Sequence, residues 1–184
     1  LSSKQTDLTG MTGELGSVVT GSPNLNLTTG TLGSGVTFPA GHIIQTRTDT
    51  VTGYYTFGNN TPTAISGFSV AMPVRSASSK ILIFLSLSGA GKSVSDTALG
   101  VRLTESATSL DVILQDLIGY NNSTAHNTSS ASSIYEHTHG QSVGTTLTYT
   151  PKFYSAANSN GTEVGNYYNG NTRLQTITIF EVMQ

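Results

Sequence analysis

From Val36 onward, short apolar segments in two-residue alternation are separated by strong turn signals, and this pattern limits what the chain can fold into. No window shows the sustained 3.6-residue periodicity of an amphipathic helix. Frequent Thr suits strands, whereas Gly, Asn and Ser suit turns. The pattern predicts an all-β fold, an antiparallel β-sandwich of jelly-roll type. The turn signals are Gly58-Asn59-Asn60, Thr61-Pro62, Gly89-Ala90-Gly91, Asn121-Asn122 and Asn169-Gly170-Asn171.

The alternation assigns the sandwich domain to residues 37–184. The expected strands are 43–47, 54–57, 68–72, 80–87, 100–104, 111–114, 145–149, 153–156 and 174–182.

Residues 1–36 differ, because their leucines and valines are isolated among Gly, Thr and Ser. Such a segment cannot build its own core, and ordering it alone would cost too much conformational entropy. It is either disordered or lies on neighbouring chains. The recurring leucines and valines favour the second, since a plain linker would lack them. We therefore expect an extended N-terminal arm that anchors the domain to other proteins.

The stretch 81–96, ILIFLSLSGAGKSVSD, looks at first like a strand that leads into a phosphate-binding loop. Lys92 and Ser93 fit the end of the G-x-x-x-x-G-K-[ST] pattern, but Ser86 stands at its first glycine. After Ser93 the chain shows strand alternation and no helix. We therefore expect a strand and a loop, not a nucleotide site.

Two strands carry apolar residues on both faces. Within 81–87 every odd-numbered residue is apolar, and Leu82 and Phe84 make the opposite face apolar as well. In the last strand, Ile177 and Ile179 lie opposite a face that includes Phe180. A strand of a two-layer sandwich should bury one face only, so the second needs an internal cover or another subunit. We favour self-association, with Leu82, Phe84, Ile177 and Ile179 at the interface.

Charge and composition disfavour several classes of function. A net charge of −2, with 10% charged residues and a pI near 6.0, gives no basic field for nucleic acid. The longest apolar run is far shorter than the ~20 residues of a membrane span, so no membrane insertion is expected. With no cysteine, disulfides and thiolate metal sites are impossible. We expect no cofactor.

The chain starts at Leu1 without a leader-like segment, which suggests processing or a longer gene product.

The sequence Glu136-His137-Thr138-His139 is the best metal candidate. On a strand, His137 and His139 share one face while Glu136 points the other way. Two ligands do not make a zinc site, but pairs from three chains could meet on a threefold axis, an arrangement known in trimeric phage fibres. The alternative is a polar strand end before Gly140.

Catalytic motifs are weak. Serines are abundant, but no G-x-S-x-G elbow is present. The ten acidic residues form no paired motif of the kind glycoside cleavage uses, and the chain has no Trp to serve as a sugar platform. We expect no enzymatic activity, although a single sequence leaves a polysaccharide depolymerase open.

Two stretches rich in Tyr and Asn, residues 53–60 and 165–171, resemble each other. Tyr offers a flat apolar face with a polar tip, and Asn offers a donor and an acceptor, which suits recognition of sugars or peptides. Ordinary hairpins explain both stretches equally well. The candidate receptor or glycan-binding residues are Tyr54, Tyr55, Tyr167, Tyr168, Asn169 and Asn171.

Three stretches together resemble structural proteins of marine and cyanobacterial tailed phages. They are FPAGHIIQ (38–45), ISGFSV leading into RSASSKILI (65–83), and ITIFEV (177–182). The corresponding patterns in that group are PAG-H-x-x-Q, PxSxSSKIL and a terminal I-x-x-x-E. The resemblance covers residues 38–184, with Val74 and Arg75 in place of a common proline and Pro73 one position away.

The resemblance implies a β-sandwich, usually a homotrimer, carried on a virion that is assembled in the host cytoplasm. It gives no catalytic residues to transfer. We expect a fibre or spike-type domain that attaches to the host, with a host surface glycan as a candidate partner. The arm, residues 1–36, would contact other virion proteins. The alternatives are a capsid decoration or cement protein and a depolymerase.

Overall fold

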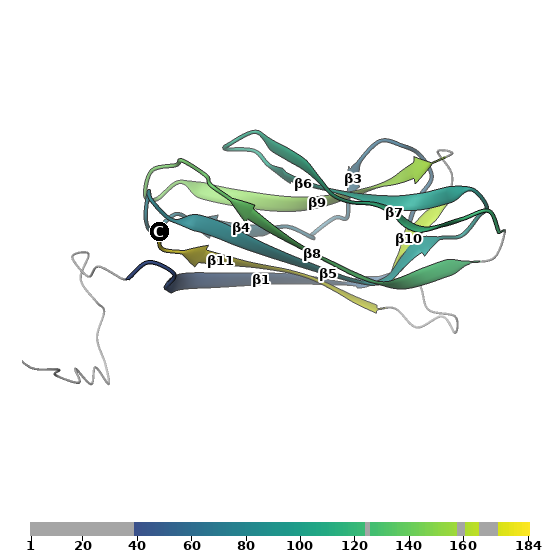
Figure 1. The fold of residues 1–184 in the computed structure, drawn as a ribbon, viewed down its shortest axis with the longest axis horizontal. Helices are drawn as coiled ribbons and strands as arrows, with labels where there is room; N and C mark the ends of the chain where they lie inside the picture. The colour runs from purple at the N-terminus through teal and green to yellow at the C-terminus, as the bar shows by residue number, and fades with distance from the viewer. Residues whose placement is uncertain (1–38, 124–125, 158–160, 166–172) are drawn as a thin grey trace, which may run out of the picture. The chain divides into compact units, whose positions relative to one another are not determined.

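The computed structural model describes residues 39–123, 126–157, 161–165 and 173–184, which form two packed antiparallel β-sheets (Figure 1). These ranges contain no helix, and so none that could cross a membrane. The first sheet consists of β1 (Ile43–Gly53), β2 (Tyr55–Phe57), β5 (Lys80–Lys92), β8 (Asn127–His137), β10 (Thr162–Val164) and β11 (Arg173–Val182). The second consists of β3 (Thr63–Ala64), β4 (Val70–Pro73), β6 (Thr97–Glu105), β7 (Leu110–Asn121) and β9 (Thr146–Ala157).

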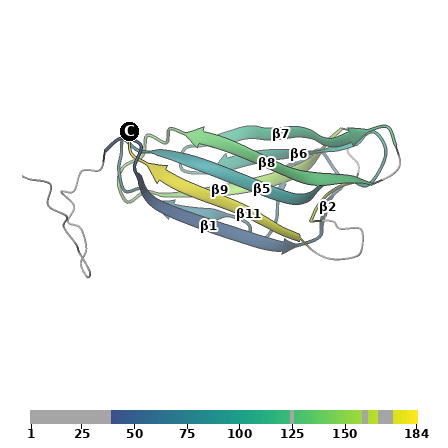
Figure 2. The ribbon, with the colours of Figure 1, turned by 60° about the horizontal axis from the view of Figure 1, so that its bottom comes forward.

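Strand β5 is the centre of the first sheet. One of its edges pairs with β11 and then with β10, and its other edge pairs with β8. β1 completes the sheet beyond β11 (Figure 2). In the second sheet, β9 pairs with β6, and β6 with β7. The edge strands β7 and β8 meet along one side of the sandwich, where Gln115 Nε2 donates to the Ser132 carbonyl oxygen (2.8 Å). The predicted antiparallel β-sandwich is confirmed.

The core lies between the two sheets. The odd-numbered residues of 81–87 face it from β5, each at most 2% exposed. From the second sheet, Phe153 stacks between Phe57 (5.3 Å between ring centroids) and Phe68 (6.5 Å). Every buried polar side-chain atom of the described residues has a hydrogen-bond partner, as a well-formed interior requires.

The GAGK segment forms the end of strand β5. The register with β8 shifts between Leu87 and Ala90, a β-bulge in which Gly89 has a φ of 62°. At Gly91 the backbone carbonyl of Asn127 lies where a Cβ would stand. Lys92 is fully buried and its Nζ donates to the Ser123 carbonyl oxygen. The next element is strand β6, so the interpretation of this segment as a strand without a phosphate loop is confirmed.

The first and last described segments of the sandwich pair with each other. The Gly41 N–H donates to the Met183 carbonyl (2.8 Å), and the Met183 N–H donates to the His42 carbonyl (2.9 Å). Both segments therefore lie at one end of the sandwich.

Several strands differ from the expected ones. Strands β3, β8 and β10 were not predicted, and the two expected strands at 145–149 and 153–156 are one continuous β9. Pro151 lies within β9 but is buried there without ending the strand. The proposed arm, residues 1–36, lies outside the described residues.

Candidate functional site

The outer face of the first sheet carries a cluster of large apolar side chains, here called the outer stripe. Leu82 pairs across strands with Phe180, and Phe84 with Ile134. The rings of Phe84 and Phe180 meet edge to face at 5.4 Å between centroids. Ile134 is 66% exposed, and the other three are partly exposed. The outer stripe is thus an apolar surface on an otherwise hydrated face.

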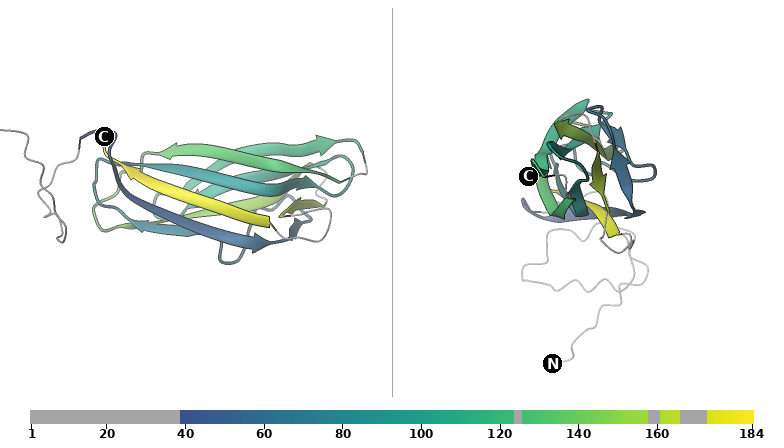
Figure 3. Two further views of the ribbon diagram at one scale, coloured as in Figure 1. Left: turned by 90° about the horizontal axis from the view of Figure 1, so that it is seen from below. Right: turned by 90° about the vertical axis from the view of Figure 1, so that its right-hand side faces the viewer.

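The outer face is formed by four adjacent strands, β1, β11, β5 and β8, which lie side by side (Figure 3, left). Threonines and serines of these strands surround the outer stripe. Cross-strand pairs place Thr48 beside Thr178, with 3.0 Å between their hydroxyl oxygens. Among the described residues, one ion pair lies close to the stripe and joins Lys80 Nζ to Glu136 Oε1 at 2.6 Å. Its positive and negative charges offset each other. The neighbouring hydroxyl residues are Thr46, Thr48, Thr50, Ser86, Ser132, Thr176 and Thr178.

The expectation that Ile177 and Ile179 lie at a subunit interface is wrong. Both are 0% exposed within a single chain and form part of its core. The alternation in β11 was read correctly, but the core takes the isoleucine face, and the opposite face with Phe180 points outward. Leu82 and Phe84, by contrast, do lie on the outer face of β5.

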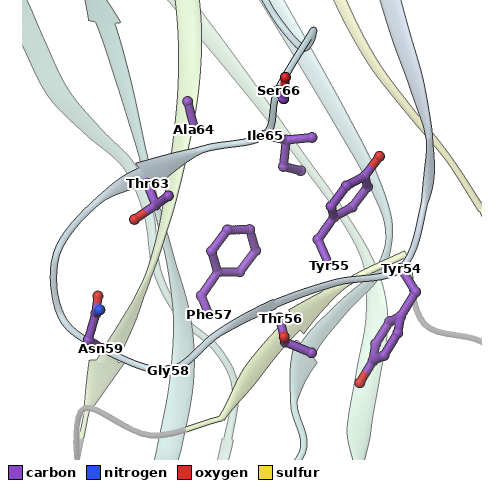
Figure 4. A pocket seen from close by; sticks show the side chains of 10 residues that line it. All are labelled: Tyr54, Tyr55, Thr56, Phe57, Gly58, Asn59, Thr63, Ala64, Ile65 and Ser66. Carbon is purple, nitrogen blue, oxygen red and sulfur yellow. The ribbon is translucent and has the colours of Figure 1, made fainter.

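Tyr54 and Tyr55 lie at the start of β2 and point to opposite sides of it (Figure 4). The Tyr54 ring is half exposed, and its hydroxyl donates to Oε2 of the fully buried Glu163 (2.9 Å). Burial, together with the hydrogen bond and charge of Glu163, raises the pKa of Tyr54 to about 12. Tyr55 packs against the core and covers Gly53. The other candidates, Tyr167, Tyr168, Asn169 and Asn171, lie outside the described residues.

A shallow, open groove of about 560 Å³ lies between β2 and the segment that follows it. Figure 4 shows Tyr55, Phe57 and Ile65 gathered on one side of β2, with Thr63 facing Phe57. The lining residues are Tyr54, Tyr55, Thr56, Phe57, Gly58, Asn59, Thr63, Ala64, Ile65 and Ser66. None of them is charged.

Residues from three stretches, 38–45, 65–83 and 177–182, converge on one buried carboxylate. Glu181 is 0% exposed, and Gln45 Nε2 donates to its Oε2. The backbone N–H groups of Arg75 and Ser76 donate to its Oε1 (2.9 Å each), and the Ser79 hydroxyl donates at 2.6 Å. The carboxylate therefore ties the β4–β5 loop to β1 and β11.

His139 extends this cluster. Its Nδ1 accepts the Gln141 N–H (2.9 Å), so its Nε2 carries the proton that faces Ser79 Oγ (3.2 Å). Burial lowers the pKa of His139, opposed in part by the Glu181 charge and by a hydrogen bond that the ring donates to the Ser79 backbone. The neutral ring thus donates to Ser79, which donates to Glu181.

His137 lies in a neighbouring buried contact. Burial raises the pKa of Tyr149, so its hydroxyl stays protonated and donates to His137 Nδ1 (2.8 Å). Burial also lowers the pKa of His137, against an opposing effect of the Glu105 charge. Burial alone would raise the pKa of Glu105, but hydrogen bonds from Ala107, Thr108 and Thr148 lower it.

The geometry argues against the proposed metal role of this His pair. His137 and His139 are 7% and 4% exposed in one chain, and each is hydrogen-bonded inside it, so neither reaches a threefold axis. Within the described ranges, no three potential ligands of the His, Cys, Asp or Glu type come together. As expected for a strand end, His137 closes β8 while Glu136 points outward to Lys80.

The Ser79–His139–Glu181 cluster does not have the arrangement of a catalytic triad. In a triad the imidazole bridges the serine and the carboxylate. Here Ser79 stands between His139 and Glu181 and is 2% exposed. The cluster is built to hold a loop in place.

Sequence reasoning missed Glu181 and Ser79, and of the groove it identified one wall, the Tyr- and Asn-rich stretch 53–60. Glu181 could have been found, because it follows Ile177 and Ile179 at two-residue steps and therefore shares their buried face. The opposite wall, residues 63–66, had no such signal, because it depends on how the segment after β2 returns to β9.

No family model matches the chain, and a search of curated proteins finds no match. Two similar solved structures come from infectious bursal disease virus. They are the crystal structure of its VP2 subviral particle (TM-score 0.44, 14% identity) and the structure of its Gx strain (TM-score 0.43, 13% identity). Each similarity covers 77% of this chain, and 38% and 43% of the respective viral chains. The chain thus spans less than half the length of either.

Proposed function

We propose that the chain is a non-enzymatic structural protein of a virion, a fibre or spike-type domain that forms a homotrimer and serves in host attachment. The resemblance of residues 38–184 to phage structural proteins supports the virion location. The outer stripe carries the proposal of self-association.

The chemistry of the outer face suits a second copy of the chain. Leu82, Phe84, Phe180 and Ile134 supply the apolar centre of a contact, and hydroxyl groups supply its uncharged margin. The Lys80–Glu136 pair leaves no net charge beside it, so identical faces can approach without like-charge repulsion.

Interface size indicates how much of the face takes part. A stable interface buries about 800 Å² on each partner, more than four partly exposed side chains supply. The contact therefore extends over the Thr and Ser residues of β1 and β11. Such a centre with a polar rim is the usual anatomy of an interface.

The test is the mass of the full chain in solution, by size-exclusion chromatography with light scattering. We expect wild type at about three times the 19.2 kDa chain mass. The double variant Leu82→Ser/Phe84→Ser should run as a folded monomer with unchanged circular dichroism. The matched control is Val143→Ser, which alters a 63% exposed side chain in a loop and should stay trimeric. A monomeric wild type at micromolar concentration would overturn the proposal of self-association.

Attachment is tested separately from assembly. Labelled wild-type protein should bind host cells and leave empty capsids uncoated. The reverse result would favour a capsid cement protein anchored through residues 1–36. Release of reducing sugar from host envelope material would instead identify a depolymerase.

A further inference from the structure

We propose that the groove between β2 and β3 binds an uncharged sugar unit. This inference deepens the proposed attachment function, because it assigns a site and a ligand class, and it rests on that function for its biological role.

The floor of the groove is apolar and rigid. Phe57 and Ile65 are 8% and 4% exposed, and the Phe57 ring is stacked on Phe153 of the core. The partly buried Tyr55 stands beside them (Figure 4). Its ring gives an apolar face with a hydroxyl tip, on which the C–H face of a sugar ring can stack.

The wall opposite β2 is fixed before any ligand arrives. The Asn59 carbonyl accepts the Ser155 N–H (2.8 Å), and the Asn59 side chain accepts the Thr61 N–H (3.0 Å). Thr63 pairs with Phe153 of β9. A loop held at these points loses little further entropy on binding, which favours affinity.

The polar groups of the rim are neutral. Asn59 uses its Oδ1 in the turn, and its Nδ2 donates to no described residue. Ser66 and Thr63 add hydroxyl groups. Donors and acceptors of this kind match sugar hydroxyls.

Charge selects the class of sugar. Among the described residues, no ionised side chain lines the groove, and the Glu163 carboxylate contacts the hydroxyl of Tyr54, which points to the other side of β2. A uronic acid, a sialic acid or a phosphorylated sugar would find no counter-charge and would lose hydration. A volume of about 560 Å³ lies within the ~300–1,000 Å³ of small-molecule sites, room for one to a few sugar rings.

The experiment titrates the full chain with neutral trisaccharides of glucose, mannose, galactose and N-acetylglucosamine, and with sialylated and uronate-containing analogues. NMR chemical shifts report the site and the affinity. We expect at least one neutral probe to shift groove resonances at millimolar concentration, with at least fivefold weaker binding of its charged analogue. Thr63→Trp, which fills the groove, should weaken binding at least tenfold. Tyr55→Phe, which keeps the ring, should stay within threefold of wild type.

The control Val143→Trp places the same side chain at a 63% exposed position outside both the groove and the outer stripe, and it should leave the affinity unchanged. Binding unaffected by Thr63→Trp, a preference for charged probes, or no shifts with any neutral probe would overturn the assignment. Equal host-cell binding by wild type and Thr63→Trp would exclude the groove as the attachment site, while the proposed attachment function would remain supported. A wild type that binds neutral probes but no cells would overturn attachment and leave the groove.

Discussion

A single carboxylate joins three distant stretches of the sequence. Gln45, Ser79 and Glu181 belong to different stretches, and all meet in one hydrogen-bond cluster. Burying a charge is costly unless hydrogen bonds replace its water. Two backbone N–H groups and two side chains do so here. These residues thus hold the loop between β4 and β5 in place.

Replacing Glu181 with Gln should destabilise the sandwich by about 2–4 kcal/mol, because an amide has one acceptor oxygen where the carboxylate has two. The amide N–H₂ would also face donors. Urea unfolding of the full chain, followed by circular dichroism, measures the change. Glu136→Gln, which alters an exposed ion pair, should cost less than about 1 kcal/mol. Equal effects of the two substitutions would show that the cluster has no special role.

At the scale of elements, the sequence predicts strands well where one face is strongly apolar. β5 and β11 alternate clearly and were found. β8 was missed, because Ala131 and Ser133 stand at its inward-facing positions and weaken the apolar period. β10 has only three residues, too few for any periodicity.

The candidate site residues were likewise predicted well where strand alternation decides their direction and poorly where tertiary contacts decide it. Leu82 and Phe84 were placed on the correct face, because strand parity fixes their direction. For Ile177 and Ile179, parity identified two faces but could not tell which one meets the core. Of the groove, the sequence indicated only the wall formed by residues 53–60, because the opposite wall depends on tertiary contacts between the segment after β2 and β9.

Gly91→Ala should destabilise the fold by about 2 kcal/mol or more. The new Cβ would meet the Asn127 backbone carbonyl of β8, which cannot move without breaking the ladder. Gly58→Ala is the matched control, because nothing lies within 4 Å of its Cβ and its φ is not positive. That substitution should change the free energy of unfolding by less than about 1 kcal/mol. A tolerated Gly91→Ala would mean that the two strands are not held this closely.

For the whole molecule, ionisable groups whose pKa values are shifted in the fold link stability to pH on both sides of neutrality. His137 and His139 have lowered pKa values in the fold, whereas in the unfolded chain they titrate near the ordinary His value of about 6.5. As the pH falls through about 6.5, the unfolded chain therefore binds more protons than the folded chain, and the fold loses stability. Glu105, also with a lowered pKa, adds a second loss of stability below about pH 4.5. Tyr54, with its pKa raised to about 12, holds its proton in the fold and favours unfolding above about pH 10.

The free energy of unfolding should therefore be greatest between about pH 7 and pH 9 and fall as the pH drops from 6.5 to 5. Urea titrations at half-unit pH intervals measure this profile. The double variant His137→Asn/His139→Asn should be less stable at pH 7.5 but lose the slope between pH 6.5 and 5. A slope that persists in this variant would assign the acid sensitivity to other groups.

The paired backbone at Gly41, His42 and Met183 has a consequence for engineering. Because the polypeptide enters and leaves the sandwich at neighbouring positions, the sandwich domain can be inserted into a surface loop of an unrelated protein without moving the two ends of that loop apart. A permuted version with a short bridge across this junction and new ends at the Val143 loop would keep every strand pairing of the described residues.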